Sequence, residues 1–128
     1  MPLVIQIQTG SSPQTAQTAN IRLSGSLDTA TAPELERQLA THLAGPVKEL
    51  VFDLAQLNFI SSAGLRVIAS ARKLLRERGG VASFVNLQPQ IQEVFDIIAS
   101  LPGIAIFKDV EELDRYLAAR QRAHQQHI

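Results

Sequence analysis

Residues 51–66 have the sequence VFDLAQLNFISSAGLR, and they decide the predicted fold. The nearly continuous apolar run over residues 49–54 predicts a central strand that is covered on both faces. Residues 57–60 are predicted to form a short apolar turn, and a helix begins at the serine pair, Ser61 and Ser62. The first N–H groups of a helix lack intrahelical acceptors and lie at the positive end of its dipole. A strand, a turn and a helix start in this order therefore suit an anion, either a bound phosphate or a phosphate attached to a serine.

The rest of the chain supplies strands and helices on either side of this stretch. Apolar periodicity predicts the strands, while capping residues, apolar stripes and glycine stops predict the helices. The first helix carries a capping-box signal, with Thr31 as its N-cap and Glu34 three residues later. The predicted strands are 3–8, 21–27, 49–54, 81–85 and 104–107, and the predicted helices are 32–44, 62–78, 89–99 and 110–120.

This order, β β α β α β α β α, predicts an α/β fold with a small mixed sheet. We expect about five strands with about four helices packed on them. The first two strands form an antiparallel hairpin, and the later strands are parallel because helices connect them. No repeat or composition break divides residues 1–128, so we expect a single domain with a disordered tail at 121–128.

The composition excludes several classes of function. Twelve basic residues balance 12 acidic ones, so bulk charge does not predict direct binding to nucleic acid. The chain has no cysteine, which excludes disulfides and thiolate metal sites. Its first residues lack the basic start and apolar core of a signal peptide, and no apolar run approaches the roughly 20 residues that span a bilayer. We therefore expect a cytoplasmic protein with no membrane insertion.

The serine pair has two interpretations at this stage. One serine could simply cap the helix with its side chain, which is a common arrangement. Alternatively, one serine carries a covalent phosphate beside the unpaired helix N–H groups. Gly64 suits both interpretations, because a residue without a Cβ lets another backbone or a phosphate approach closely.

An enzymatic alternative would use Ser62 as an acyl-transfer nucleophile. The stretch lacks the first glycine of the Gly-x-Ser-x-Gly elbow, and a serine nucleophile needs a base. His42 lies in a predicted helix, whereas His124 and His127 lie in the tail, where they lack a third ligand for a metal. We therefore expect no enzyme, no catalytic residue, no cofactor and no metal site.

Two aspartates lie at the ends of predicted strands. Asp28 is either a turn or capping residue or part of a docking surface at the same end of the sheet as Ser62. Asp53 is predicted to end the central strand and to hydrogen-bond the loop before Ser61, which is a structural role.

Three segments carry a resemblance to a known family. They are residues 23–28 (LSGSLD), residues 51–65 with the core ISSAGL, and residues 79–95 with the markers GG, FVN and VF. In this order they resemble STAS domains, the group of bacterial anti-sigma factor antagonists and related modules on sulfate transporters. The resemblance covers nearly the whole chain, and it implies a small mixed sheet with helices packed on it.

The resemblance also implies a mechanism of partner switching. An unphosphorylated antagonist binds an anti-sigma factor, often itself a serine kinase, which phosphorylates the antagonist and thereby dissociates the complex. A serine phosphatase resets the system. By position in the motif, the phosphorylation site maps onto Ser62. The family usually has Asp before this serine, whereas this chain has Ser61, which leaves the helix start less negative and offers a second hydroxyl.

The resemblance implies a docking surface around the start of this helix. We expect the phosphate to block docking by its bulk and charge, with little internal rearrangement. Stand-alone STAS proteins that serve lipid-transporting ABC systems are the alternative, and there the serine need not be phosphorylated. The expected partner-binding residues are Asp28, Ser61, Ser62, Ala63 and Gly64, with Leu65 and Arg66 at the margin.

Overall fold

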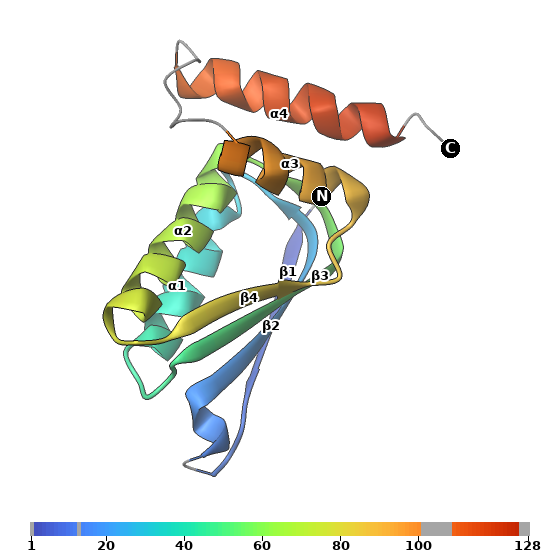
Figure 1. Cartoon of the computed structure of the whole chain (residues 1–128). Coiled ribbons are helices and arrows are strands. Elements are labelled where there is room, and N and C mark those ends of the chain that lie inside the picture. The colour runs from blue at the N-terminus through green and yellow to red at the C-terminus, as the bar shows by residue number, and fades with distance from the viewer. Residues whose placement is uncertain (1, 13, 101–108, 126–128) are drawn as a thin grey trace.

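A computed structural model describes residues 2–12, 14–100 and 109–125, which form a mixed sheet and its helices (Figure 1). The sheet has four strands in the order β1-β2-β3-β4. β1 and β2 form the predicted antiparallel hairpin, and β3 runs parallel to both β2 and β4. The predicted fifth strand at 104–107 lies outside the described residues. The elements are β1 (Leu3–Thr9), a short 3₁₀ turn (Thr15–Gln17), β2 (Thr18–Leu27), α1 (Ala32–Leu43), β3 (Glu49–Ile60), α2 (Ser62–Glu77), β4 (Val81–Val85), α3 (Pro89–Ser100) and α4 (Val110–Gln125).

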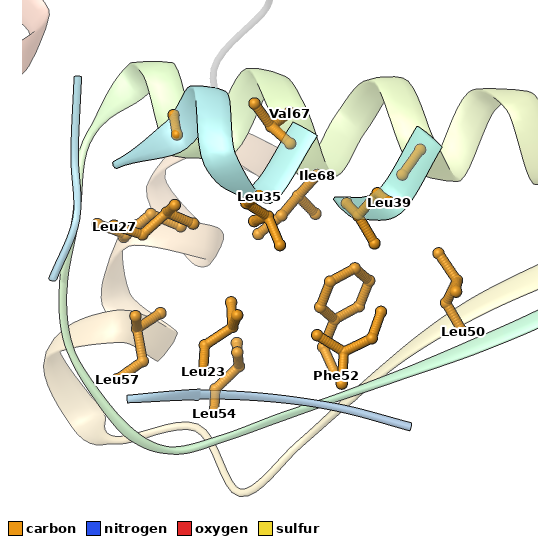
Figure 2. Packing of buried hydrophobic residues seen from close by; sticks show 14 of the residues in the cluster. Leu23, Leu27, Leu35, Leu39, Leu50, Phe52, Leu54, Leu57, Val67 and Ile68 are labelled. Carbon is orange, nitrogen blue, oxygen red and sulfur yellow. The ribbon is translucent and has the colours of Figure 1, made fainter. Parts of the chain in front are cut away.

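The core lies between the sheet and the pair α1 and α2. Figure 2 shows apolar side chains of the two helices facing Leu23, Phe52 and Leu54 of the sheet. Along β3, Leu50, Phe52 and Leu54 are buried, whereas the residues between them are only half-buried. The prediction that β3 is covered on both faces is therefore wrong. Asp53 lies within β3 and not at the end of the strand. Its carboxylate accepts the N–H of Ala55, which belongs to the same strand, at 3.1 Å.

β3 is longer than the sequence predicts, because residues 57–60 continue the strand instead of forming a turn. Their backbone pairs with the end of β2, which matches Gly25 to Leu57 and Leu27 to Ile60 with one register irregularity between these two pairs. A strand partner satisfies backbone groups that a buried turn would leave unpaired. As a result β2 and β3 end side by side, at Leu27 and Ile60.

The turn before α1 is organised by Asp28 and not by a capping box. One carboxylate oxygen of Asp28 accepts the N–H groups of Ala30 at 3.0 Å and Thr31 at 3.1 Å. Thr31 occupies the N-cap position, but its hydroxyl donates to the carbonyl of Ser26 at 2.9 Å. The predicted capping box is therefore absent from this described turn, since the Thr31 hydroxyl has another partner.

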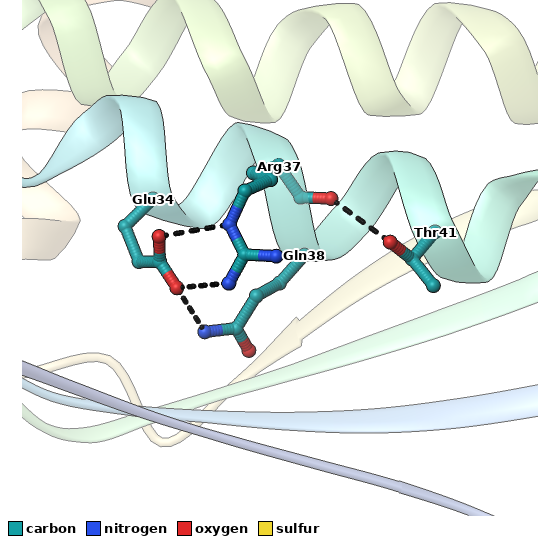
Figure 3. Close-up of polar contacts among 4 residues, drawn as sticks. All are labelled: Glu34, Arg37, Gln38 and Thr41. Atoms are coloured by element: carbon teal, nitrogen blue, oxygen red, sulfur yellow. Dashed lines mark hydrogen bonds and ion pairs between the residues drawn. The ribbon is translucent and has the colours of Figure 1, made fainter.

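Glu34 instead makes an exposed network along α1 (Figure 3). Arg37 Nη2 donates to its carboxylate at 2.6 Å, and Gln38 donates to the same oxygen at 2.9 Å. These donors, with Arg37 first, lower the pKa of Glu34 to about 2. The contacts are between residues three and four positions apart, which share one helix face.

α4 runs five residues beyond its predicted end. Asp109 caps its start as predicted, by accepting the N–H of Glu112 at 2.8 Å. The helix then continues to Gln125, so residues 121–125 are not the disordered tail that the sequence suggested. The reason is tertiary: Gln121 is only 3% exposed and its side chain is bonded to β3.

Candidate functional site

The start of α2 lies at the end of the sheet where β2 and β3 finish. Ser61 N–H donates to the Leu27 carbonyl at 2.9 Å, which brings the turn at Asp28 beside the serine pair. The sequence prediction that Asp28 shares this end of the sheet is thus confirmed. A shallow hollow opens here between the ends of the two strands and α4, and it is lined by Asp28, Phe59, Ser61, Glu111, Asp114 and Arg115, among others.

Ser62 is bound by a residue that sequence reasoning missed. Its N–H donates to Oδ1 of Asp114 at 2.8 Å, and its hydroxyl donates to Oδ2 of the same carboxylate at 2.9 Å. Asp114 belongs to α4, 52 residues further along the chain. Its negative charge lies at the positive end of the α2 dipole, which is favourable. Asp114 therefore caps α2 from another helix, a role that one interpretation of the serine pair assigned to a serine side chain.

Ser61 has a different environment from its neighbour. It occupies the N-cap position of α2, yet its side chain makes no capping hydrogen bond. Its hydroxyl oxygen is buried and has no hydrogen-bond partner within the described residues. The two adjacent serines are thus chemically distinct: one hydroxyl is held by a carboxylate, and the other is enclosed and unpaired.

Gly64 allows α2 to pack closely on the ends of β2 and β3. A Cβ on this residue would lie 2.6 Å from Leu27 Cγ and 3.1 Å from Ile60 Cγ1. Gly64 is buried and faces inward, whereas Ala63 and Leu65 are half-buried and Arg66 is exposed. The sequence predicted that another group approaches Gly64 closely. In the structure that group is the protein's own core, formed here by Leu27 and Ile60.

α4 is bonded to β3 as well as to Ser62. The side-chain amide of Gln121 accepts the N–H of Ile60 at 2.9 Å and donates to the Ile60 carbonyl at 2.8 Å. These two hydrogen bonds attach α4 to Ile60, the residue that precedes the serine pair in sequence.

α4 is also bonded to α3, through Glu93. Arg120 Nε donates to Glu93 Oε1 at 2.6 Å, and His124 Nε2 contacts the other carboxylate oxygen. These two donors, with His124 first, hold the pKa of Glu93 below its ordinary value. His124 therefore lies in an ordered helix and not in a frayed tail, while His127 lies outside the described residues.

Comparison with known proteins identifies the family. The STAS domain family matches residues 12–113. The chain belongs to the STAS domain family. In sequence this STAS domain is 40% identical over 75 residues to BtrV of Bordetella bronchiseptica, which is named as an anti-sigma factor antagonist. It is 30% identical over 78 residues to the anti-sigma F factor antagonist of Paenibacillus polymyxa. These matches cover 59% and 60% of this chain.

The matches also cover 65% of BtrV and 67% of the Paenibacillus protein, so about a third of each relative lies outside them. In structure the STAS domain is similar to the unphosphorylated form of SpoIIAA, an anti-sigma factor antagonist of Bacillus, with a TM-score of 0.62 and 22% identity. That similarity covers 73% of this chain and 83% of SpoIIAA, and the phosphorylated form of SpoIIAA gives a TM-score of 0.61. The structural comparison confirms the predicted fold.

A carboxylate lies beside Ser62 although the residue before it in sequence is uncharged. The sequence resemblance leads one to expect Asp at that preceding position, and this chain has Ser61 there. Asp114 supplies a carboxylate beside Ser62 from α4 instead. The hollow around it carries two further carboxylates, Asp28 and Glu111, and one cation, Arg115. The surface beside Ser62 is therefore mainly acidic.

The described residues contain no group of three or more His, Asp or Glu side chains placed to bind a metal ion. None of the described helices combines the length and the apolar character that crossing a bilayer requires.

Proposed function

We propose that this STAS protein is an anti-sigma factor antagonist that is switched off by phosphorylation of Ser62. Its partners are an anti-sigma factor with serine kinase activity and a serine phosphatase that removes the phosphate. The observation that carries the proposal is the place of the Ser62 hydroxyl, at the N-terminus of α2 and against Asp114 of α4, in a chain whose sequence relatives are named as anti-sigma factor antagonists. SpoIIAA, which shares the fold, has been solved both with and without a phosphate.

The environments of the two serines support Ser62 as the acceptor. The Ser61 hydroxyl oxygen is enclosed by protein atoms, and its own backbone is fixed to Leu27. The Ser62 hydroxyl is held by a single side chain, that of Asp114. The Ser62 hydroxyl thus has a partner at the surface hollow beside α4, whereas the Ser61 hydroxyl has none among the described residues, and this difference favours Ser62 as the acceptor.

Phosphorylation of this residue would oppose binding of a partner for a simple electrostatic reason. A phosphoserine adds about −1.5 to −2 charges at neutral pH. In the middle of a protein–protein contact these charges must be desolvated or paired, and leaving them unpaired costs several kcal/mol. Since about 1.4 kcal/mol changes affinity tenfold, the complex would weaken by orders of magnitude.

The first test is mass spectrometry of the protein isolated from its own host, with fragmentation of the peptide that spans residues 61 and 62. Phosphate on Ser62 supports the proposal. Phosphate on Ser61 alone contradicts the assignment of Ser62 as the acceptor. The absence of phosphate from both serines under every growth condition contradicts regulation by phosphorylation.

The second test captures partners from host extract with immobilised protein. Wild type and Ser62→Ala should retain an anti-sigma factor that phosphorylates the wild-type chain in the presence of ATP. Ser62→Glu should lose it, and Ser61→Ala is the matched control that keeps it. Capture of the ATPase subunit of a transporter, equally by all four proteins, would favour the transport role in place of the sigma-factor role.

A further inference from the structure

β1 is an outer strand of the sheet, and its outer edge lacks the features that usually keep strand edges unpaired (Figure 1). Natural sheets protect such edges with charged side chains, prolines, bulges or a covering helix. The strand has the sequence LVIQIQT, without a charged residue or a proline. It pairs with β2 in regular register, and its main contacts in the described structure are with β2 and the 3₁₀ turn. The N–H and C=O groups that β1 directs away from β2 are therefore available to another strand.

The side chains of β1 divide between the two faces of the sheet, and neither set carries a charge. Three half-buried side chains pack against the hydrophobic core: Leu3, Ile5 and Ile7. On the opposite face Val4 is 52% exposed, and Gln6 and Gln8 present exposed amides. An identical strand can therefore pair with β1 without bringing like charges together, an arrangement that destabilises a sheet when the charges are directly opposite.

A two-fold axis at Gln6 makes this strand complementary to itself. Gln6 is the middle residue of β1, so antiparallel pairing about it uses the whole strand. In this register Ile5 lies opposite Ile7 of the second copy, and Val4 lies opposite Gln8. The axis is perpendicular to the sheet, so the helices of both copies lie on the same side and the half-buried isoleucines become neighbours there. Apolar cross-strand pairs of this kind stabilise a sheet.

We propose that β1 is a dimerisation surface whose partner is β1 of a second copy of this chain, in the antiparallel register centred on Gln6. The two four-stranded sheets then form one continuous sheet. The contact closes at the dimer, because each copy uses its β1 edge once. The 12 basic and 12 acidic residues of the chain balance, so no net charge opposes the approach of a second copy. The proposal does not rest on phosphorylation of Ser62.

The first experiment measures the mass of the full chain by sedimentation equilibrium as its concentration rises. We expect the mass to increase from 14.0 kDa towards twice that value between about 1 μM and about 1 mM, since a single strand pair is a small interface. A chain that stays monomeric over this range overturns the proposal. Growth beyond the dimer also overturns it, because the two-fold contact is closed.

Two double variants test the register. Val4→Lys with Gln8→Lys places like charges opposite each other across the two-fold axis, and Val4→Glu with Gln8→Glu does the same with the opposite sign. Both positions are exposed, and in their own chain they pair with the uncharged residues Ser24 and Asn20, so the hairpin should stay intact. Each variant alone should dimerise more weakly than wild type by about tenfold or more, because the like charges repel.

A mixture of the two double variants is the decisive control. When one chain carries the lysines and the other the glutamates, each lysine faces a glutamate, so the mixed dimer should form at least as tightly as the wild-type dimer. A general effect on folding cannot produce this recovery, because each chain carries the same substitutions alone and in the mixture. Failure of the mixture to dimerise overturns the proposed register, and so does dimerisation of each variant alone as tightly as wild type.

Discussion

At the scale of single residues, the serine pair shows how adjacent identical side chains acquire different roles. Ser61 points its hydroxyl into protein without a described partner, whereas Ser62 gives both its N–H and its hydroxyl to Asp114. A buried polar atom without a partner destabilises a fold, while a hydrogen bond to a charged group stabilises it. The two serines should therefore respond in opposite directions to the same substitution.

Replacing each serine by alanine tests this difference. Ser61→Ala should leave the free energy of unfolding unchanged or raise it by up to about 1 kcal/mol, because an unpaired hydroxyl is removed. Ser62→Ala should lower it by about 1–2 kcal/mol, because Asp114 loses a donor. Equilibrium urea unfolding measures both, and an equal loss in the two variants would contradict the described environments.

Gly64 provides a second test at this scale. Gly64→Ala places a methyl group 2.6 Å from Leu27 Cγ in a fully buried cluster, so neighbouring side chains must shift. Overpacking of this kind costs about 1–3 kcal/mol. The control is Gly45→Ala, where the nearest atom lies at 3.5 Å on an exposed turn. If the two variants have the same urea midpoint, α2 does not pack against Leu27 as closely as described.

At the scale of elements, α4 is held by polar side chains as much as by apolar ones. Glu93 joins α3 to α4 through Arg120 and His124, and its lowered pKa reports this contact. A carboxyl whose pKa is lower in the folded state stabilises the fold above its unfolded pKa. That contribution is lost as the pH falls through the folded value.

The contact between α3 and α4 should therefore weaken in acid, below the ordinary carboxyl pKa of 4.5. Glu93→Gln lacks the titrating group, so it should be less stable than wild type at pH 7, and the difference should narrow towards pH 3. Urea midpoints of the two proteins across this range measure the difference. A gap that stays constant with pH would show that the Glu93 charge does not stabilise the contact.

Local sequence patterns predicted most of the helices and strands. They also predicted two residues of the candidate site, Ser62 and Asp28, but not Asp114. β4 has the bounds expected from the sequence, and α2 begins at the serine pair because an apolar strand and a helical stripe meet there. Residues 57–60 were misassigned because their strand geometry is imposed by pairing with β2 across irregular register. The end of α4 was missed because Gln121 is polar, and only its distant partner Ile60 explains its burial.

The candidate site also depends on a contact between residues that are far apart in sequence. Ser62 and Asp28 follow directly from helix-start and strand-end signals near them. Asp114 lies in a helix whose sequence shows an ordinary polar face, and nothing local assigns it to a helix start 52 residues earlier. Spatial proximity created by the fold was needed to find it.

At the scale of the whole molecule, one hydrophobic core joins the four described α-helices to the sheet. The cluster that contains Leu23 and Phe52 also contains Ile91 of α3 and Leu117 of α4. A shared core of this kind favours a single cooperative transition, which is also what the expected single domain requires.

Tyr116 allows that cooperativity to be measured, since it is the one tyrosine of a chain without tryptophan and it lies on α4. In the unmodified protein, urea unfolding followed by tyrosine fluorescence should coincide with unfolding followed by far-ultraviolet circular dichroism. A fluorescence transition that precedes the dichroism transition would show that α4 unfolds as a separate unit.

The contact between Gln121 and Ile60 has a consequence for solubility. β4 pairs with β3 only as far as Asp53, and at Ile60 a side-chain amide supplies the donor and acceptor that a neighbouring strand would offer. A strand end with unpaired backbone groups is a template for association with other chains. Any loss of α4 from this position would uncover such an end, so Gln121 protects the chain from self-association as well as holding α4 in place.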